Sequence, residues 1–377
     1  MARWRCRTSV AAALLSSQTW TASPGRRSLH RRLIALVGPT SDPGGSMQRE
    51  GLRQGEGGSM TAQSDGWAGM GWDWTDGDDI RRRLDEGADP ERWSGGRPLH
   101  RAAVFGSREV VAELAGRVAD VDALEDGVTA LWEAVVARKP DNARALAAAG
   151  ADPWRLSIGG WSPGRLSLAG PTPGLFPVPE GVSLTDTERA AAQEADRLTT
   201  ALGEFYYDGT GLACVADIDA AEAVRRLEAA PMGDEAVDGL LDDPYGYDMD
   251  ESLQILGVTS VPGGCVVTQP WGYAPQMPGV LARLSAGTVC YGLYANPKSG
   301  NQGAIARHGT IEGSDLHPGG GPHENDPSRE VLASYLYQHS AVAYACAFAG
   351  LRLNDRRAVV GPPDMWVELP RRDYWSH

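Results

Sequence analysis

The sequence predicts a mixed fold, in which an all-α repeat solenoid is followed by an α+β domain with a mainly antiparallel sheet. The first observation is a short motif ending in Asp that recurs at Asp89, Asp120 and Asp152. Such a regular recurrence is typical of stacked helical repeats. The second is the alternation, after residue 185, of short apolar strands with longer helical patterns. The chain has 377 residues, of which 42% are hydrophobic, so two domains are expected.

Composition and charge exclude several classes of protein. The apolar content excludes a fully disordered or collagen-like chain, and no apolar run approaches the roughly 20 residues of a membrane span. The formal charge is −14. Residues 1–59 hold nine arginines and three acidic residues, a net of +6, so residues 60–377 carry −20. An acidic body argues against binding to nucleic acid, which requires a basic surface.

The chain has five cysteines: Cys6, Cys214, Cys265, Cys290 and Cys346. This odd number at wide spacings, without a Cys-x-x-Cys pair, indicates neither a disulfide framework nor a zinc site. We therefore expect free thiols, a reducing compartment such as the cytoplasm, and no cofactor. Only two of the 35 basic residues are lysine, a codon bias typical of a high-GC bacterium.

Residues 1–59 are left out of the fold prediction. Their two apolar runs are each shorter than the roughly 7–15 residues of a signal peptide's apolar region. The run of Gly, Glu and Ser at residues 55–59 directly precedes Met60 and corresponds to purine-rich codons, as a translated ribosome-binding site would. We interpret residues 1–59 as a disordered tail or a mis-annotated start, with Met60 or Met47 as the true first residue.

Residues 60–170 contain two independent motifs on one period. Asp89, Asp120 and Asp152 each follow an alanine and are almost equally spaced along the chain. A second motif repeats at a similar spacing. Partial copies of the repeat precede and follow the two clear ones. The second motif covers residues 96–103 and 127–134, a half-repeat covers 78–86, and a worn further copy covers 160–166.

Each copy is expected to form a pair of short helices. Pro98 suits a first helical turn, where its missing N–H leaves nothing unpaired, and Leu99, Ala102 and Ala103 share one helix face. A helix pair cannot bury its own apolar stripe, so neighbouring copies must stack. With so few copies, we expect the array to be capped by packing against the rest of the chain. The expected helices cover residues 98–105, 108–117, 130–137 and 141–149.

The repeat resembles the ankyrin repeat, which is marked by Thr-Pro-Leu-His-x-Ala and by a regular period close to the one seen here. Pro98, Leu99, His100 and Ala102 hold family positions, whereas Arg97 stands where Thr is usual. The resemblance covers roughly residues 75–170. It implies an ankyrin-type solenoid that binds a partner protein through its turn tips and inner helices. Carried onto this chain, the partner-binding residues are Trp93, Arg97, Arg101, Glu125, Asp126, Trp132 and Glu133.

Two aromatic positions of the repeat have alternative interpretations. Trp132 stands where the family has His and is either a surface anchor or a side chain packed against the next copy. His100 has no second ligand nearby in the sequence, so a hydrogen bond to the backbone is favoured over a metal-binding or catalytic role.

A Pro- and Gly-rich linker is predicted over residues 171–184, and an α+β domain over residues 185–377. The domain opens with Thr185-Asp-Thr-Glu188, a capping box for a helix to about residue 202. Pro262-Gly263-Gly264 predicts a hairpin. Further helices are expected at 219–229, 279–286 and 329–349, and strands at 212–216, 256–261, 265–269, 288–295, 304–308 and 310–312.

This second domain resembles an uncharacterised bacterial domain family. The resemblance depends on the strand–helix opening, on the Pro-Gly-Gly hairpin with Trp271, and on the helix-to-strand step at residues 284–288. It implies no activity. Some proteins of similar architecture are suspected immunity proteins against secreted toxins, which is an association only.

The sequence assigns no catalytic residue and no metal ligand. No nucleophile, base and orienting residue can be assembled, and neither a Walker nor a Rossmann motif is present. The loop from His317 to Asp326 holds two histidines and two carboxylates and would admit a metal ion. Its glycine-rich spacer lacks the rigidity that holds ligands, so we expect none.

Residues 217–251, the acidic segment, hold twelve acidic residues against Arg225 and Arg226 alone. The segment is either a solvated loop flanking a helix or a docking surface for a basic partner. The sequence as a whole favours a protein-interaction module with an unidentified protein partner, and an inhibitor or immunity role is one version of it. The alternative is an enzyme or small-molecule sensor in the second domain, with the repeats as adaptor.

Overall fold

The computed structural model describes residues 66–71, 73–243, 248–315 and 317–375. The expectations for residues 1–59, including Cys6 and a start at Met47 or Met60, lie outside the described residues. Within the described part, the chain forms helices and one antiparallel sheet of eight strands. The predicted mixture of helices and antiparallel strands is therefore confirmed.

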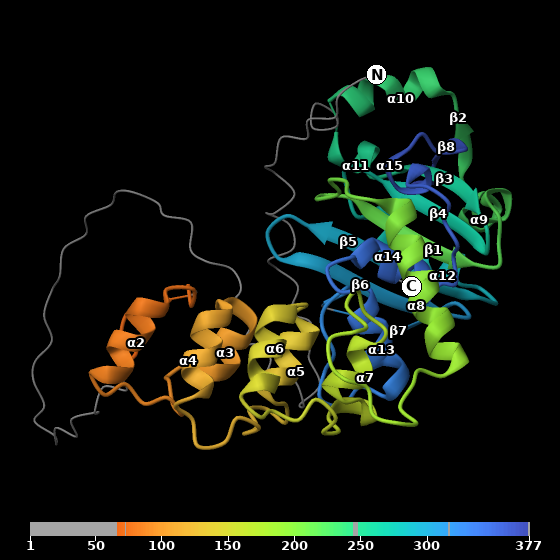
Figure 1. Ribbon diagram of the computed structural model, residues 1–377. Helices are drawn as coiled ribbons and strands as arrows, with labels where there is room; N and C mark the ends of the chain where they lie inside the picture. Colours follow the sequence, from red (N-terminus) through yellow and green to blue (C-terminus); the bar gives the residue numbers. More distant parts are fainter. Residues whose placement is uncertain (1–65, 72, 244–247, 316, 376–377) are drawn as a thin grey trace, which may run out of the picture. The chain divides into compact units, whose positions relative to one another are not determined.

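The first described residues form a row of short helices, which we call the helical array (Figure 1). α3 packs on α4, and α5 packs on α6, so the two predicted helix pairs are present. The array consists of α2 (Gly77–Asp85), α3 (Pro98–Phe105), α4 (Arg108–Ala115), α5 (Ala130–Val136), α6 (Pro140–Ala148), the 3-10 turn η2 (Ile158–Gly160) and α7 (Pro163–Ser167).

Equivalent helices of the two pairs stack on each other, α3 against α5 and α4 against α6. Alanines on the facing surfaces allow the helices to approach closely, and each pair buries the apolar stripe that its neighbour leaves uncovered. Leu99, Ala102 and Ala103, which were predicted to share one helix face, are buried. The other apolar side chains buried between the helix pairs are Val110, Val111, Leu114, Leu131, Ala134 and Leu146.

A buried asparagine joins the two helix pairs. The side-chain amide of Asn142, in α6, donates to the backbone oxygens of Ala103 at 3.1 Å and Gly106 at 2.9 Å. The oxygen of Ala102 lies 3.4 Å from the same nitrogen. Carbonyls at the end of a helix have no partner within it, so Asn142 caps α3 from the neighbouring pair. The sequence analysis did not single out this residue.

The strands form one sheet in the order β2-β8-β3-β4-β1-β5-β6-β7, and every neighbouring pair is antiparallel. All six predicted strands are present, with β6 and β7 longer than expected, whereas β2 and β8 were not predicted. The strands are β1 (Gly211–Ala216), β2 (Ala230–Met232), β3 (Ile255–Val261), β4 (Gly264–Gln269), β5 (Val289–Asn296), β6 (Gly300–Arg307), β7 (Thr310–Asp315) and β8 (Met365–Glu368).

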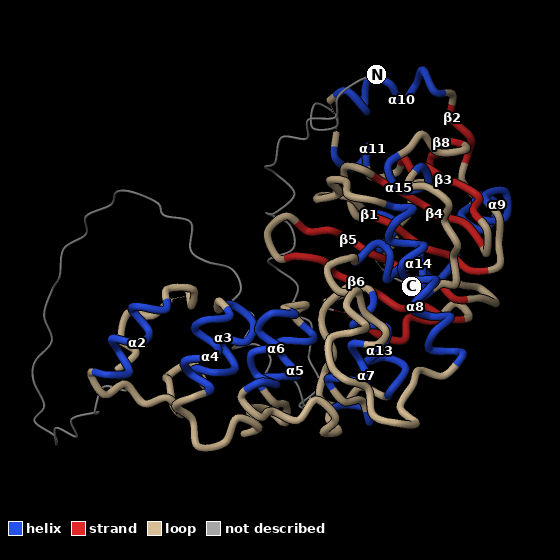
Figure 2. Tube along the Cα trace, in the orientation of Figure 1, coloured by secondary structure: helices blue, strands red, loops and turns tan. Residues whose placement is uncertain are grey.

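Helices cover both faces of the sheet (Figure 2). Along β1, Leu212 and Cys214 join one hydrophobic core, whereas Ala213 and Val215 join the other. This alternation explains why β1 is apolar and buried along its whole length. One face carries α8 (Asp186–Leu202) and α14 (Ala341–Phe348), and the other carries α9 (Ala220–Leu227) and α12 (Pro278–Leu284).

The helical array packs against α13 (Ser328–Leu336). Trp161 is fully buried, and its indole Nε1 donates to the backbone oxygen of Ser328 at 2.9 Å. The guanidinium of Arg138 donates to the backbone oxygens of Tyr335 at 3.0 Å and Leu336 at 3.1 Å. These contacts cover the end of the array, as a further repeat would. The expectation that the array packs against the rest of the chain is therefore confirmed.

The connection between the array and the sheet follows the sequence prediction. Residues 171–184 contain no helix or strand. The predicted capping box is present at the start of α8: Glu188 N–H donates to Thr185 Oγ1 at 3.2 Å, and Thr185 N–H donates to Glu188 Oε2 at 2.8 Å. Glu188 also accepts from Arg165 of the array at 2.6 Å.

Two predictions about the C-terminal domain are wrong. The helix expected over residues 329–349 is divided into α13 and α14, because His339 adopts a φ of +64° and donates its backbone N–H to Gly319. The acidic segment is not a loop beside one helix. It contains α9, β2, α10 (Asp234–Asp242) and α11 (Met249–Ser252). The short helix α15 (Arg357–Val360) was not predicted. None of the described helices combines the length and hydropathy of a bilayer-spanning segment.

Candidate functional site

A tight turn precedes the first helix of each unit, and we call these turns tip 1 (residues 93–96), tip 2 (125–128) and tip 3 (157–161). Tips 1 and 2 are each closed by two backbone hydrogen bonds of 2.8 to 3.1 Å between their end residues. Tip 3 is one residue longer and is closed by a 2.7 Å bond from Ser157 N–H to the oxygen of Trp161. In tip 2, Asp126 and Gly127 both have positive φ, 49° and 82°, the conformation that a two-residue hairpin turn requires and that Asp-Gly favours.

Hydrogen bonds between residues about one repeat apart join tip 2 to the start of α3, the helix that follows tip 1. Glu125 Oε2 in tip 2 accepts from the backbone N–H of Arg97, 28 residues earlier, at 3.3 Å. His100 Nε2 lies 3.0 Å from the backbone oxygen of Val128, again 28 residues away. His100 is 6% exposed, so the predicted backbone-bonding role of this histidine is confirmed.

Three of the predicted partner-binding residues, on or beside tip 1, are engaged within the array. Trp93 is half-buried and packs edge-to-face on Trp74, with ring centroids 5.4 Å apart. Arg97 forms an ion pair of 2.6 Å with Glu91. The Arg101 guanidinium lies over the ring of Phe105, 4.4 Å from its centroid. All three side chains are partly exposed, and their positions are set by these contacts.

The four remaining predicted residues differ in exposure. Asp126 is exposed at the end of tip 2, Glu133 is half-buried, and the side chain of Glu125 is 21% exposed. Trp132 is only 2% exposed, which corrects its assignment to the binding surface: it packs inside the array, as the alternative interpretation held. The surface role was inferred from the frequency of tryptophan at interfaces, but the large apolar ring joins the buried core of the array.

Two leucines that the sequence analysis did not select lie exposed at equivalent places. Leu124 directly precedes tip 2 and is 47% exposed, and Leu156 directly precedes tip 3 and is 71% exposed. Their separation in the sequence equals that between Asp120 and Asp152, which is one period of the repeat. The period was therefore the signal that could have found them.

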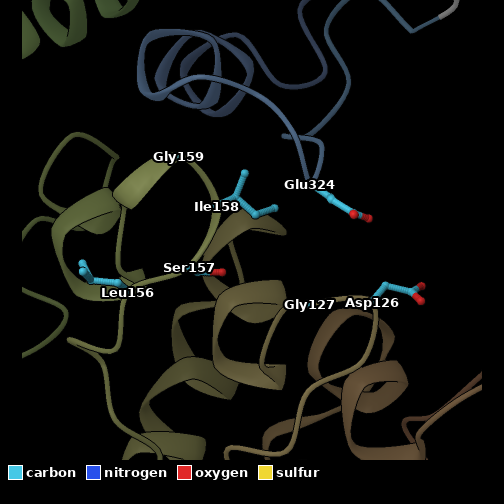
Figure 3. A pocket seen from close by; sticks show the side chains of 7 residues that line it. All are labelled: Asp126, Gly127, Leu156, Ser157, Ile158, Gly159 and Glu324. Atoms are coloured by element: carbon cyan, nitrogen blue, oxygen red, sulfur yellow. The ribbon is translucent and has the colours of Figure 1, made fainter. Parts of the chain in front are cut away.

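An open depression lies beside tips 2 and 3 (Figure 3). The carboxylates of Asp126 and Glu324 gather on one side of it, Leu156 lies on the opposite side, and Ser157 and Ile158 lie between them. Glu324 belongs to the loop from His317 to Asp326. The lining residues are Asp126, Gly127, Leu156, Ser157, Ile158, Gly159 and Glu324.

Part of the charge of the acidic segment is neutralised within the chain. Glu222 accepts hydrogen bonds from Arg225 at 2.6 Å and Arg226 at 2.7 Å, and these guanidinium groups lower the pKa of Glu222 to about 2. Glu228 is paired with Arg372 near the C-terminus. Glu222 and Glu228 are therefore charged groups paired within the chain, and of their partners only Arg372 comes from outside the acidic segment.

The cysteines that the structure describes are buried free thiols. Cys214 and Cys346 place their sulfur atoms 3.7 Å apart, and burial raises the pKa of Cys265 to about 12. Thiols in this state are poor nucleophiles. Among the described residues, no group of three His, Cys, Asp or Glu side chains is placed to hold a metal ion. In the loop from His317 to Asp326, His323 N–H donates to Asp326.

No family model matches the sequence, and no curated protein matches it significantly.

Proposed function

We propose that this chain is a protein-interaction module, in which an ankyrin-type helical array binds a partner protein through its turn tips. The observation that carries the proposal is the pair of leucines beside tips 2 and 3. Leu124 and Leu156 are 47% and 71% exposed at equivalent positions of successive repeats. Removing exposed apolar side chains from water on binding is favourable, and stacked repeats present their equivalent positions along one surface.

Three features support an ankyrin-type array. The helix pairs α3/α4 and α5/α6 stack in register, and each pair is preceded by a hairpin turn. His100, at the position of the family's histidine, contacts the backbone of the next turn. Rigid repeats of this kind present their turns as one extended surface.

The chemistry of the chain favours a basic partner in a reducing compartment. The formal charge of −14 attracts a positively charged surface and repels an acidic one. An inhibitor or immunity role is the version in which the partner is an enzyme. The cysteines described as free thiols favour the cytoplasm, where thiols remain reduced.

The test compares the chain with a double variant at the tips and a single Val→Arg control away from them. The tagged full-length protein, its Leu124→Arg/Leu156→Arg variant and a Val178→Arg control are each produced in the source organism, and co-purifying proteins are quantified by mass spectrometry. Val178 is a matched control because it is 47% exposed and lies in the linker. Circular dichroism and thermal unfolding of each purified variant verify the fold.

We expect a partner that is recovered with the wild type and the control but is depleted at least tenfold with the double variant. The purified pair should then bind with the same rank order of affinities. A partner recovered equally with all three proteins would contradict the proposal. So would a small-molecule turnover by the purified chain that survives the double substitution, and that result would favour an enzyme or sensor.

A further inference from the structure

Two cysteines from distant parts of the chain meet in the core of the sheet domain. Cys214 lies in β1, the strand between β4 and β5, and Cys346 lies in α14. Their sulfur atoms are 3.7 Å apart, although 132 positions separate the two residues in the sequence. Both side chains are fully buried free thiols. Because a disulfide bond is about 2.0 Å long, the two sulfur atoms need to approach each other by only about 1.7 Å to bond.

The other two described cysteines lie on the opposite face of the sheet. Cys265 in β4 and Cys290 in β5 both pair with Val215, the residue that follows Cys214 in β1. Successive residues of a strand point to opposite faces, and the two pairs of cysteines accordingly belong to different hydrophobic cores. Since β1 lies between them, Cys265 and Cys290 are two strand spacings apart, about 10 Å, which is too far for a disulfide bond. They therefore form a matched control pair.

The closed structure protects the thiols of Cys214 and Cys346 from oxidants. The hydrogen bond with Cys346 and burial raise the pKa of the Cys214 thiol, and the thiolate is the form that reacts. The ring of Phe348, in α14, lies 5.1 Å from that of Tyr291, in β5, and this contact helps to hold the helix on the sheet. An oxidant therefore reaches the pair during local opening of α14, a motion of the kind that folded proteins undergo.

We propose that Cys214 and Cys346 form a reversible disulfide bond when the chain is exposed to a hydroperoxide, so that α14 becomes covalently joined to β1. One thiolate attacks the peroxide oxygen and becomes a sulfenic acid, and one water leaves when the oxidant is hydrogen peroxide. The second thiol then attacks the sulfenic sulfur, the S–S bond forms, and a second water leaves. The two cysteines lose two electrons, which the peroxide gains, and a thiol reductant reverses the reaction. Disulfides of cytoplasmic proteins are typically transient and redox-sensing in this way.

The bond would act on the segment that caps the helical array. α13 covers the last unit of the array, and α14 follows α13 in the chain. A covalent bond across 132 positions restricts the unfolded chain and stabilises the fold. Oxidation would therefore strengthen the sheet domain at the face on which the array is capped, whether or not a partner is bound.

The experiment oxidises the folded full-length chain with hydrogen peroxide in a Cys6→Ser background, which removes the cysteine outside the described residues. Remaining thiols are alkylated, and the protein is digested and analysed by mass spectrometry without reduction. We expect one cross-linked peptide pair, which joins residue 214 to residue 346 and is lost on treatment with dithiothreitol. The midpoint of thermal unfolding should rise by about 5–10 °C on oxidation.

Two matched variants assign the bond. Cys346→Ala should lose both the cross-link and the rise in the unfolding midpoint, whereas the Cys265→Ala/Cys290→Ala variant should retain both. Phe348→Ala removes the contact with Tyr291, so the bond should form at least threefold faster. Circular dichroism before oxidation verifies that each variant is folded, and the cross-link of the unsubstituted core is read without any of these changes.

The inference would be overturned if Cys214 and Cys346 stayed reduced in the folded chain, or cross-linked only in urea. A cross-link between Cys265 and Cys290 of equal abundance would also overturn it, since oxidation would then not follow the geometry of the core. An unfolding midpoint that does not rise in the cross-linked protein would contradict the stabilising effect. A rate unchanged by Phe348→Ala would contradict the role of α14 opening. None of these outcomes depends on the proposed partner.

Discussion

The helical array and the sheet domain are stabilised by contacts of different range. In the array, hydrogen bonds between successive repeats join residues 28 or 30 positions apart, about one repeat. In the sheet, β3 pairs with β8, so Leu256 lies beside Val367, and β1 is placed between β4 and β5. A repeat encodes its contacts in a local period, whereas the sheet depends on pairings between distant segments.

At its last unit, the array depends on the sheet domain for burial of its apolar side chains. The last unit consists of η2 and the short helix α7, and α13 of the sheet domain covers it. A repeat array needs about three units and a capping element for stability. The four predictions below test how far the two regions depend on each other and on single buried groups.

The largest effect is expected at the joint between the regions. Trp161→Ala removes a fully buried ring, its bond to the oxygen of Ser328, and the surface on which Arg165 lies 4.3 Å from the ring centroid. The free energy of unfolding should fall by about 3–5 kcal/mol, and one unfolding transition should become two. Urea denaturation followed by circular dichroism measures both. Trp375→Ala, at a ring 41% exposed, is the control, and a similar loss there would contradict the account.

The next largest loss of stability is expected at a buried side-chain amide of the sheet domain. Gln269 Nε2 donates to the backbone oxygens of Leu253 and Ile255 at 3.1 and 2.9 Å, and Oε1 accepts from Ala274 N–H at 2.9 Å. Gln269→Leu keeps the volume but leaves these groups unpaired, which should lower the free energy of unfolding by about 2–3 kcal/mol. Gln193→Leu, at an exposed position, should change the free energy of unfolding little. Equal effects of the two substitutions would contradict the stabilising role assigned to Gln269.

The corresponding amide of the array should matter less, because it supplies donors only. Asn142→Ala leaves the oxygens of Ala103 and Gly106 without their donor, and we expect a loss of about 1–2 kcal/mol. Hydrogen exchange should show faster opening at the end of α3 than in the sheet. The control is Asn354→Ala at an exposed position. Opening that is uniform across both regions would show that Asn142 does not act on α3.

The smallest effect is a pH dependence at the start of α8. Burial raises the pKa of Glu188, but hydrogen bonds from the Thr185 backbone and the Arg165 guanidinium outweigh it, so the pKa lies below its ordinary value of 4.5. A carboxyl with a depressed pKa stabilises the fold above its unfolded-state pKa, and this contribution is lost as the pH falls through the folded-state value.

Glu188→Gln should therefore be about 0.5–1 kcal/mol less stable than the wild type at pH 7. The difference should shrink as the pH falls below about 4.5, the ordinary value for glutamate. Thermal unfolding of both proteins between pH 7 and 3 measures it. A difference that stays constant to pH 3 would show that the Glu188 carboxylate does not make this contribution.

Much of the array could be predicted from the sequence, because each of its elements carries a local signal. Pro98 starts α3, and Gly106 and Gly116 follow the ends of α3 and α4. The exposed leucines repeat with the same period but were missed, since apolar residues at turns were not compared between copies. Trp132 was included in the binding surface because large amphipathic rings often anchor interfaces, and the alternative, a ring packed inside the array, is the one that the structure shows.

Most of the helices and strands of the sheet domain were predicted, but the order of the strands in the sheet was not. The four-residue strand β8 lies between prolines at 363 and 370 and has no alternating pattern, so nothing local marks it. The break between α13 and α14 depends on the contact of His339 with Gly319. The placement of Glu324 beside tips 2 and 3 depends on how α13 packs on tip 3, a tertiary contact that no sequence period encodes.

The most direct test of the account is hydrogen exchange measured by mass spectrometry on the purified complex of this chain with its partner. The account predicts slower exchange, relative to the free chain, in residues 89–97, 121–128 and 153–160, with the sheet unchanged. Slower exchange confined to the strands or to the acidic segment, with the three tips exchanging as in the free chain, would contradict it.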